Sequence, residues 1–322
     1  MSHSLLVGAT GNTGAPLAAL LAERGERFTC LARTRARAAA LERLGYTTVV
    51  ADLDRPETLS AAFDARPDRA YLVCTPDERM VDRECALIDA AKAAGVSRVV
   101  KLSAYLAAPD APTKNLRDHA IIEAHLAASG MEWTSLRPHG FMQTFVLISL
   151  DFVKGAGLYL HSAGDGAMAL VDVRDVGLAA AKVLLEDGHD GQIYDLTGPE
   201  GLTFQQQAEQ LAVAFGRPVT YVNGDEASLE RGMRFMGVAP QSIEHATIIM
   251  RLCREHRIGD VRDGMARLGI APRSFATFCA DLVARRTGGG NSFQPPSGLA
   301  FQVGSRAMIG WYRAKFAIFG RG

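Results

Sequence analysis

Three glycines near the start of the chain have the spacing of a phosphate-binding loop. Gly8, Gly11 and Gly14 stand in "LLVGATGNTGAPL", between an apolar run and a segment rich in alanine and leucine. In such a loop the first glycine permits a tight turn, the second lets the backbone approach a pyrophosphate, and the third lets the helix pack on the strand. Glycines also occupy strand-to-helix turns for packing alone. Because this triplet follows the first of many apolar runs, it predicts a dinucleotide site.

Arginines at the end of the second apolar run indicate which dinucleotide would bind. The stretch "FTCLARTRARAAAL" carries Arg33, Arg35 and Arg37 and no carboxylate. Sites for NAD usually present an acidic residue here to the ribose hydroxyls, whereas sites for NADP present an arginine to the 2′-phosphate. A solvated basic helix face would account for Arg37 but less easily for Arg33. The pattern therefore favours NADP(H) over NAD(H).

The elements that would position these residues follow from the hydrophobic pattern. Short apolar runs alternate with longer helical segments from residue 4 to about 137. This alternation is typical of βαβ units and predicts an α/β fold, with a Rossmann-like doubly wound parallel sheet and a smaller C-terminal α+β lobe. The expected domains are an NADP-binding Rossmann domain at 1–150, to which 168–198 returns; a substrate-binding lobe at 151–167 and 199–286; and a linker and tail at 287–322.

Composition limits the partners and the location. The chain has 322 residues, with 35 basic and 35 acidic side chains, so no overall field favours nucleic acid or an anionic membrane. The five cysteines show no metal-ligand spacing, which predicts free thiols and no metal site. No secretion signal and no apolar run of the roughly 20 residues that a span needs are visible, so a cytoplasmic location is expected. The tail mixes aromatic and basic residues; docking on a partner subunit or a membrane surface is weighed against a helix packed on its own chain or a mobile terminus, which is favoured. A homodimer is among the expected assemblies.

A series of motifs resembles one family along most of the chain. The motifs are "VGATGNTG", "LAR", "ADLDRPETL", "YLVCTP", "GVSRVVKLSAY", "HAIIEAHLAASGMEWTSLRPHGFMQTF", "VDVRDVG" and "YDLTGPEGLTFQQQAEQLA". In this order they resemble the atypical short-chain dehydrogenases, specifically the NmrA-like group of quinone, triphenylmethane-dye, azo-compound and ergot-alkaloid reductases and cofactor-sensing regulators. The resemblance runs from residue 4 to about 285 and leaves only the tail outside.

The resemblance also implies a set of cofactor-binding positions. The glycine loop would line the phosphates, the second strand would end at the 2′-phosphate, the next two loops would approach the adenosine, and the later strand ends would flank the nicotinamide. In that order the positions are Gly8, Thr10, Gly11, Asn12, Thr13 and Gly14; Arg33; Asp52, Leu53, Cys74, Thr75 and Pro76; and Ser103, His119, Pro138 and Phe141.

The segment "KNLRDHAIIEAHL" departs from the wider superfamily at its catalytic pair. A tyrosine that protonates an alkoxide and a lysine four residues later are usual there, but Asn115 and His119 stand at these positions. Loss of the phenol argues against simple carbonyl reduction and favours acceptors that need little acid help, namely quinones, iminium ions and cationic dyes. Glu123, one helical turn after His119, could orient its imidazole. The candidate catalytic residues are His119, Ser103, His139 and Tyr105, and the candidate substrate-binding residues are Phe141, Met142 and Phe145, for which core packing is an equal alternative.

Three functions stay open at this point. The first is an NADPH-dependent reductase of a small conjugated substrate, which makes the chain an oxidoreductase. The second is a non-catalytic regulator that senses NADP(H) and acts through a protein partner. The third is a biosynthetic cyclase or isomerase on the same fold.

Overall fold

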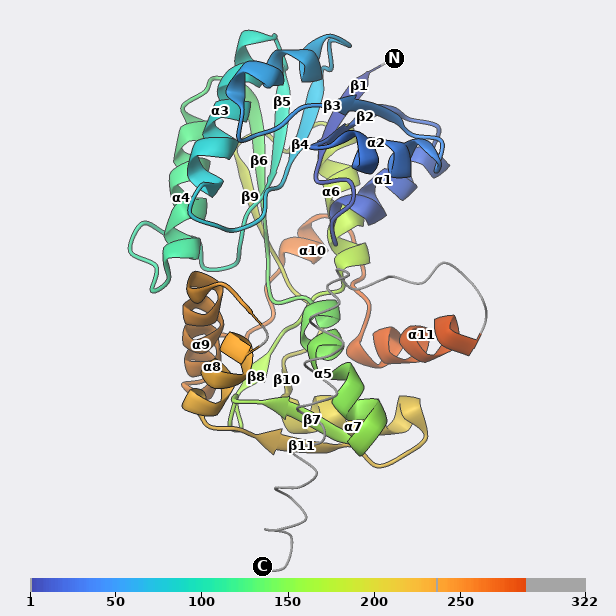
Figure 1. Cartoon of the computed structure of the whole chain (residues 1–322), viewed down its shortest axis with the longest axis vertical. Helices are drawn as coiled ribbons and strands as arrows, with labels where there is room; N and C mark the ends of the chain where they lie inside the picture. The colour runs from blue at the N-terminus through green and yellow to red at the C-terminus, as the bar shows by residue number, and fades with distance from the viewer. Residues whose placement is uncertain (1, 236, 288–322) are drawn as a thin grey trace, which may run out of the picture. The chain divides into compact units, whose positions relative to one another are not determined.

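The computed structural model describes residues 2–235 and 237–287, and these form two compact units (Figure 1). The first unit is assembled from three stretches of chain, 2–139, 173–197 and 262–272. The second contains residues 140–172, 198–261 and the described part of the chain after 272. The linker and tail expected at 287–322 lie, from residue 288 onward, outside the described residues.

A seven-stranded sheet forms the centre of the first unit. Its strand order is β3-β2-β1-β4-β5-β6-β9, and every neighbouring pair is parallel. This order confirms the Rossmann-like fold predicted from the alternating pattern. β9 corresponds to the late apolar stretch "GQIYDLTG" and extends the sheet beyond β6. The strands are β1 His3–Val7, β2 Arg27–Ala32, β3 Thr47–Val50, β4 Arg69–Leu72, β5 Arg98–Leu102, β6 Glu132–Pro138 and β9 Gln192–Leu196.

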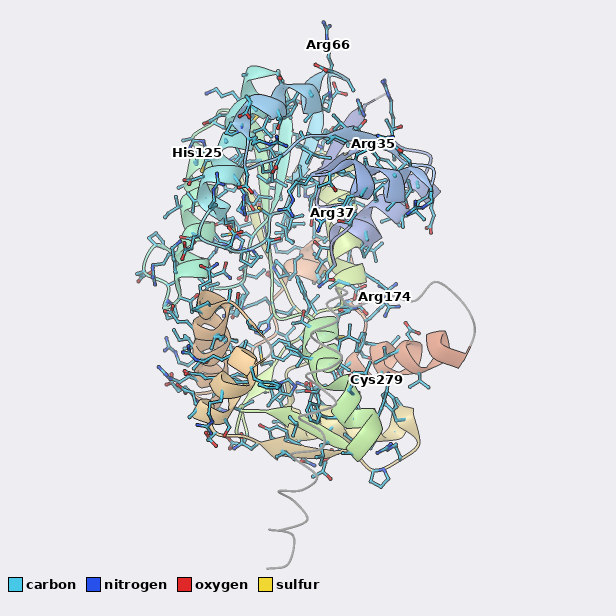
Figure 2. All side chains as sticks on the ribbon, in the orientation of Figure 1. Arg35, Arg37, Arg66, His125, Arg174 and Cys279 are labelled. Atoms are coloured by element: carbon cyan, nitrogen blue, oxygen red, sulfur yellow. The ribbon has the colours of Figure 1, made fainter. Side chains whose placement is uncertain are left out.

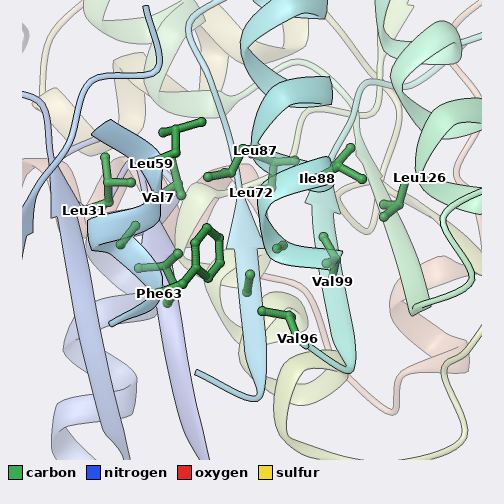
Figure 3. Close-up of a cluster of buried hydrophobic side chains, with 14 of the residues drawn as sticks. Val7, Leu31, Leu59, Phe63, Leu72, Leu87, Ile88, Val96, Val99 and Leu126 are labelled. Atoms are coloured by element: carbon green, nitrogen blue, oxygen red, sulfur yellow. The ribbon is translucent and has the colours of Figure 1, made fainter. Parts of the chain in front are cut away.

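Helices bury both faces of this sheet, which explains why its central strands are apolar almost throughout. On one face Leu59 and Phe63 of η1, Leu87 of α3 and Leu126 of α4 pack with strand residues such as Val99 in a continuous core (Figure 3). On the other face α1 and α6 pack against each other, and α6 also contacts β4, β5 and β6. The helices are α1 Gly14–Glu23, α2 Arg35–Glu42, η1 Pro56–Phe63, α3 Met80–Ala93, α4 Lys114–Ala127, α6 Val173–Leu185 and α10 Gly264–Arg267.

The second unit is a smaller α+β structure. β7 (Leu158–His161) pairs in parallel with β11 (Thr220–Asn223), and β8 (Ala167–Met168) pairs antiparallel with β10 (Leu202–Thr203). α7 (Phe204–Phe215) begins with a capping box between Thr203 and Gln206 and ends at Gly216 with φ +61°, where a glycine readily adopts the left-handed backbone. The other helices are α5 Met142–Ala156, α8 Glu226–Phe235, α9 Pro240–Arg254 and α11 Phe275–Thr287.

The boundaries of the units differ from the ranges expected for the domains. The first break comes after His139 and not near residue 150, because α5 packs against β7 and so belongs to the second unit. The return of residues 262–272 to the first unit was not expected. There α10 packs on β9, and Gly264 lies so close to the backbone of Asp195 that a Cβ would come within 2.2 Å of its carbonyl oxygen.

Two further properties concern the described residues as a whole. No helix among them is both long and apolar enough to cross a membrane. All five cysteines are free thiols, and burial raises the pKa of Cys30 and of Cys279 to about 12.

Candidate active site

The glycine loop between β1 and α1 has a geometry that only glycine allows at two positions. Gly8 has φ +77°, and a Cβ there would lie 2.5 Å from Val73 Cγ1. A Cβ on Gly14 would lie 2.2 Å from the carbonyl oxygen of Gly8, so the start of α1 sits directly on the turn. Gly11 is exposed, and a Cβ there would meet only the Gly8 oxygen at 3.2 Å. The loop is therefore compact on its inner side and open to solvent at Gly11.

The residues between these glycines differ in exposure. Thr10 is exposed, Asn12 is half-buried, and Thr13 is buried, where its Oγ1 accepts a hydrogen bond of 3.0 Å from the hydroxyl of Tyr71 on β4. Thr13 makes no side-chain cap to α1. In the first turn of α1 the N–H of Ala15 donates to the carbonyl of Gly11 at 3.0 Å, and Pro16 has no N–H. The N–H of Gly14 forms no hydrogen bond among the described residues, so it is the group at this helix start that an anion could use.

The three arginines after β2 separate into one that is paired and two that are not. Arg35 donates two hydrogen bonds, of 2.9 and 2.8 Å, to the carboxylate of Glu42 at the other end of α2. Arg33 and Arg37 are exposed, and within the described chain their side chains form no hydrogen bond or ion pair (Figure 2 labels Arg35 and Arg37). Arg33 directly follows the strand, where its charge lowers the pKa of Asp54, secondary to the hydrogen bond from Arg83. A guanidinium is therefore available for a phosphate beside the glycine loop.

Ion pairs to Arg83 join the loop after β3 to the loop after β4. Asp54 accepts hydrogen bonds of 2.6 and 3.0 Å from Arg83 on α3, and Arg83 also donates to Asp77 at 2.5 Å. Asp52 accepts a hydrogen bond of 3.1 Å from the backbone N–H of Asp54 and so stabilises the turn after β3. In the loop after β4, burial raises the pKa of Cys74 to about 11. The remaining predicted positions here are a half-buried Leu53 and exposed Thr75 and Pro76.

The ends of β5 and β6 meet at the same edge of the sheet. The backbone N–H of Ser103 donates to the carbonyl of Leu136 at 2.7 Å, and that of Tyr105 donates to the carbonyl of Pro138 at 3.0 Å. The hydroxyl of Ser103 and the amide oxygen of Asn115 are buried without a hydrogen-bond partner in the part of the chain that the structure describes. Buried polar atoms of this kind usually bind a ligand or water. The two orphaned atoms, together with the open glycine loop, fit a dinucleotide laid along the carboxyl ends of the strands.

His119 is held by a buried lysine that sequence reasoning did not single out. Lys101 on β5 and Glu84 on α3 are both fully buried and form an ion pair of 2.6 Å. The Lys101 ammonium also donates to the carbonyl of Leu102 and to Nδ1 of His119, each at 3.1 Å. An ammonium can only donate, so Nδ1 must carry the lone pair. His119 is then a neutral imidazole with its proton on Nε2, and so it is a hydrogen-bonding residue rather than a cationic acid.

Glu123 belongs to a different network from the one expected. Its carboxylate accepts hydrogen bonds of 2.9 and 2.5 Å from Arg137 and another from the Ser135 hydroxyl. Burial tends to raise the pKa of Glu123, but Arg137, Ser103 and Ser135 together outweigh burial and lower it, although the Ser103 hydroxyl stops short of hydrogen-bond geometry. The expectation that Glu123 orients the imidazole is not met, because it joins α4 to β6 while Lys101 holds His119.

Tyr105 and His139 lie together at the same sheet edge. Their ring centroids are 4.9 Å apart, with the planes tilted by 32°. Arg262, from the returning segment 262–272, donates to the Tyr105 hydroxyl through Nε at 3.1 Å and through Nη2 at 2.9 Å. The guanidinium carbon also stands 5.6 Å from the centroid of the phenol ring. The structure thus brings together two predicted catalytic residues and an arginine 157 positions away.

The residues predicted to bind substrate belong to the second unit. Met142 is buried, and Phe145 packs on His161 and Phe204 with centroid distances of 5.7 and 5.9 Å. Both are therefore part of the packing of that unit. Phe141 precedes α5, is half-buried and forms a bridge with Val171. Among the described residues no cluster of histidine, cysteine and carboxylate could hold a metal ion.

Comparisons with known proteins agree with this geometry. The model of an NAD(P)H-binding family matches residues 8–146. An NAD(P)H azoreductase of Xenophilus azovorans is 32% identical over 275 residues, which span 85% of this chain and 96% of the relative. The chain belongs to this NAD(P)H-binding, NmrA-like family. Quinone oxidoreductase 2 of Escherichia coli is 30% identical over 72% of this chain and 82% of the relative, and its structure complexed with NADPH covers 88% of this chain and 100% of that chain with a TM-score of 0.77.

A third comparison concerns the fold. The triphenylmethane reductase of a Citrobacter species, complexed with NADP(H), matches with a TM-score of 0.78 at 21% identity, over 88% of this chain and 100% of that chain. The family assignment confirms the resemblance read from the motifs, and it makes this member an NAD(P)H-dependent oxidoreductase. The prediction of an enzyme is thereby confirmed over that of a sensor without catalysis.

Proposed function

We propose that this reductase transfers a hydride from NADPH to a small conjugated acceptor of the quinone, azo or cationic-dye type. The observation that carries the proposal is the contrast between two parts of the first unit. The glycine loop and Arg33 are arranged to receive a dinucleotide phosphate, whereas the phenol and ammonium usual on α4 are replaced by Asn115 and a neutral His119. Bound NADPH would supply the hydride, and the protein would orient the acceptor.

The residues that would hold the cofactor follow from their surroundings. The backbone around Gly11 and the N–H of Gly14 at the start of α1 would bind the pyrophosphate, and Arg33 would bind the 2′-phosphate. Ser103 and Asn115, each with an orphaned oxygen, and His119, with a proton on Nε2, would bind the nicotinamide half. The names of the relatives support dye and quinone acceptors, since they are an azoreductase and a quinone oxidoreductase.

Acceptor reduction tests the activity directly. NADPH oxidation is followed at 340 nm with menadione, the azo dye methyl red and the triphenylmethyl cation crystal violet as acceptors. We expect turnover with at least one of them and none with a simple ketone. Turnover of ketones alone, or no turnover with any acceptor despite NADPH binding, would contradict the proposed function.

Arg33→Ala tests the cofactor preference. Loss of a charge-assisted contact to the 2′-phosphate should weaken NADPH binding by about 10- to 100-fold and leave NADH binding nearly unchanged. Arg35→Ala is the matched control, because Arg35 is already paired with Glu42. Equal losses for both nucleotides in Arg33→Ala would show that the 2′-phosphate is bound elsewhere.

A further inference from the structure

The hydroxyl of Tyr105 is held in one orientation by Arg262. Two guanidinium N–H groups donate to its oxygen, at 3.1 and 2.9 Å, and so occupy both lone pairs. The phenolic proton must then point away from the arginine, and no atom of the described residues accepts it. Tyr105 itself is 7% exposed. Among the residues that the structure describes, the phenol is therefore a buried donor whose proton has no acceptor.

A positive charge beside the phenol oxygen bears on whether the phenol can act as an acid. In the wider superfamily a lysine ammonium favours the tyrosinate and so makes the tyrosine an acid. Here the guanidinium of Arg262 contacts the phenol oxygen directly and lies over the ring. Asp195 on β9 also lies near this arginine: burial raises the pKa of its carboxyl, and the charges of Arg137 and Arg262 oppose that shift. A phenol with an adjoining cation is thus present, but it is built from β5 and the returning segment rather than from α4.

His119 is poorly suited to the same task. Its Nδ1 accepts from Lys101, so a proton leaves it only from the neutral ring. A phenol gives up its proton more readily than a neutral imidazole does, and the adjoining guanidinium would stand beside the tyrosinate that is left. This comparison separates the two predicted candidates, because His119 is arranged to bind and Tyr105 is arranged to donate a proton.

We propose that Tyr105 is the catalytic acid of this reductase and that Arg262 positions its hydroxyl and supplies the positive charge beside it. The step rests on the proposed function. After a hydride adds to one end of a neutral conjugated bond, negative charge collects at the other end. The Tyr105 O–H bond breaks, and the proton bonds to that atom. The tyrosinate keeps the electron pair beside the Arg262 guanidinium and later takes a proton from water.

The backbone next to Tyr105 is consistent with a specialised loop. Leu106 has φ +67°, in the left-handed region that residues with a side chain rarely adopt, at a cost of about 1–2 kcal/mol. The turn is closed by a hydrogen bond of 3.1 Å from the N–H of Ala107 to the carbonyl of Ala104. Strained residues of this kind concentrate at functional sites, where the fold holds a side chain in place.

Acceptors that differ in their need for a proton provide the test. Hydride addition to crystal violet neutralises a cation and needs no proton, whereas hydride addition to the azo bond of methyl red leaves a nitrogen anion that must be protonated. Tyr105→Phe and Arg262→Gln should each lower kcat for methyl red by about 100-fold and leave its KM, the KM for NADPH and the rate with crystal violet unchanged. Arg262→Lys should restore part of the methyl red activity, since it restores the charge.

Arg267→Gln is the matched control. Arg267 belongs to the same returning segment and stands 4.5 Å over the ring of Tyr194, so its loss disturbs the segment in a comparable way without touching Tyr105. Its methyl red activity should stay that of the wild type. Three results would each refute the assignment of Tyr105 as the acid without refuting the reductase activity. They are equal losses with both acceptors, unchanged methyl red activity in Tyr105→Phe, and a wild type that reduces only crystal violet. No turnover of either dye by the wild type would overturn the proposed function itself.

Discussion

Replacing Lys101 by methionine should destabilise the first unit by about 3–5 kcal/mol. The side chain is fully buried, and its ammonium pairs at 2.6 Å with Glu84, which is fully buried too. Removing the lysine leaves a carboxylate in the core without a counter-charge, and one oxygen of that carboxylate already lacks a hydrogen-bond partner in the described chain. The cost is therefore set by the uncompensated charge, and the lost contacts to Leu102 and His119 add to it.

A double variant separates the charge from the contacts. In Lys101→Met with Glu84→Leu neither charge remains, so the cost should fall to about 1–2 kcal/mol for the donors that Leu102 and His119 lose. The double variant is thus expected to be more stable than Lys101→Met alone. Lys182→Met is the control, because the Lys182–Glu186 pair is largely exposed and should contribute less than about 1 kcal/mol.

Urea unfolding followed by tryptophan fluorescence measures these free energies. Trp133 lies on β6 of the first unit, and a Trp311→Phe background makes it the sole tryptophan of the chain. Additive costs in the double variant, or a cost below about 1 kcal/mol for Lys101→Met, would refute the view that this pair is a tightly coupled buried charge.

Three further predictions concern the loop, its support and the second unit. Gly14→Ala should lose both stability and nucleotide binding, because its Cβ would lie 2.2 Å from a backbone atom. Gly11→Ala, whose Cβ would have its nearest contact at 3.2 Å, should fold and lose mainly nucleotide affinity, as measured by titration calorimetry. Tyr71→Phe should cost about 1 kcal/mol in urea unfolding by removing the buried hydrogen bond to Thr13, and no loss would show that water replaces it. Burial lowers the pKa of His161 from 6.5 to about 3, so the neutral form is the folded one: the stability that it contributes is complete above pH 6.5 and lost as the pH falls toward 3. His161→Leu should remove up to about 1.4 kcal/mol per pH unit from that slope, and an unchanged slope would contradict the assignment.

The fold could be predicted because its signals are local, and the proposed phosphate end of the site rests on signals of the same kind. A glycine triplet, an arginine at a strand end and apolar runs with helical spacers each lie within a few residues of one another. The doubly wound parallel sheet follows from such patterns. The exposed, unpaired Arg33 is likewise where a short pattern suggested it.

The catalytic end was harder to predict because its contacts are distant in sequence. Lys101 is in an apolar strand, where a lysine signals burial only if its partner on α3 is known. Glu123 follows His119 by one helical turn, yet in the folded chain its carboxylate accepts a hydrogen bond from Arg137. Arg262 lies in a polar stretch with no motif, and only the return of its segment to β9 brings it to Tyr105. The lysine within "VVKLS" was the one signal that could have been followed further.

The three-part first unit has a consequence for the order in which the chain folds during synthesis. β6 is complete at residue 138, but its neighbour β9 begins only at 192, which is a delay of roughly 3–11 s at a ribosomal rate of about 5–20 residues per second. During this time β6 is an unpaired edge, open to another nascent chain. Arg262 emerges later still, so a chain that ends before it would carry the complete glycine loop proposed for the nucleotide, while its phenol lacked the guanidinium. The proposed cofactor loop and the proposed acid, Tyr105 with Arg262, would thus be completed at different times during synthesis.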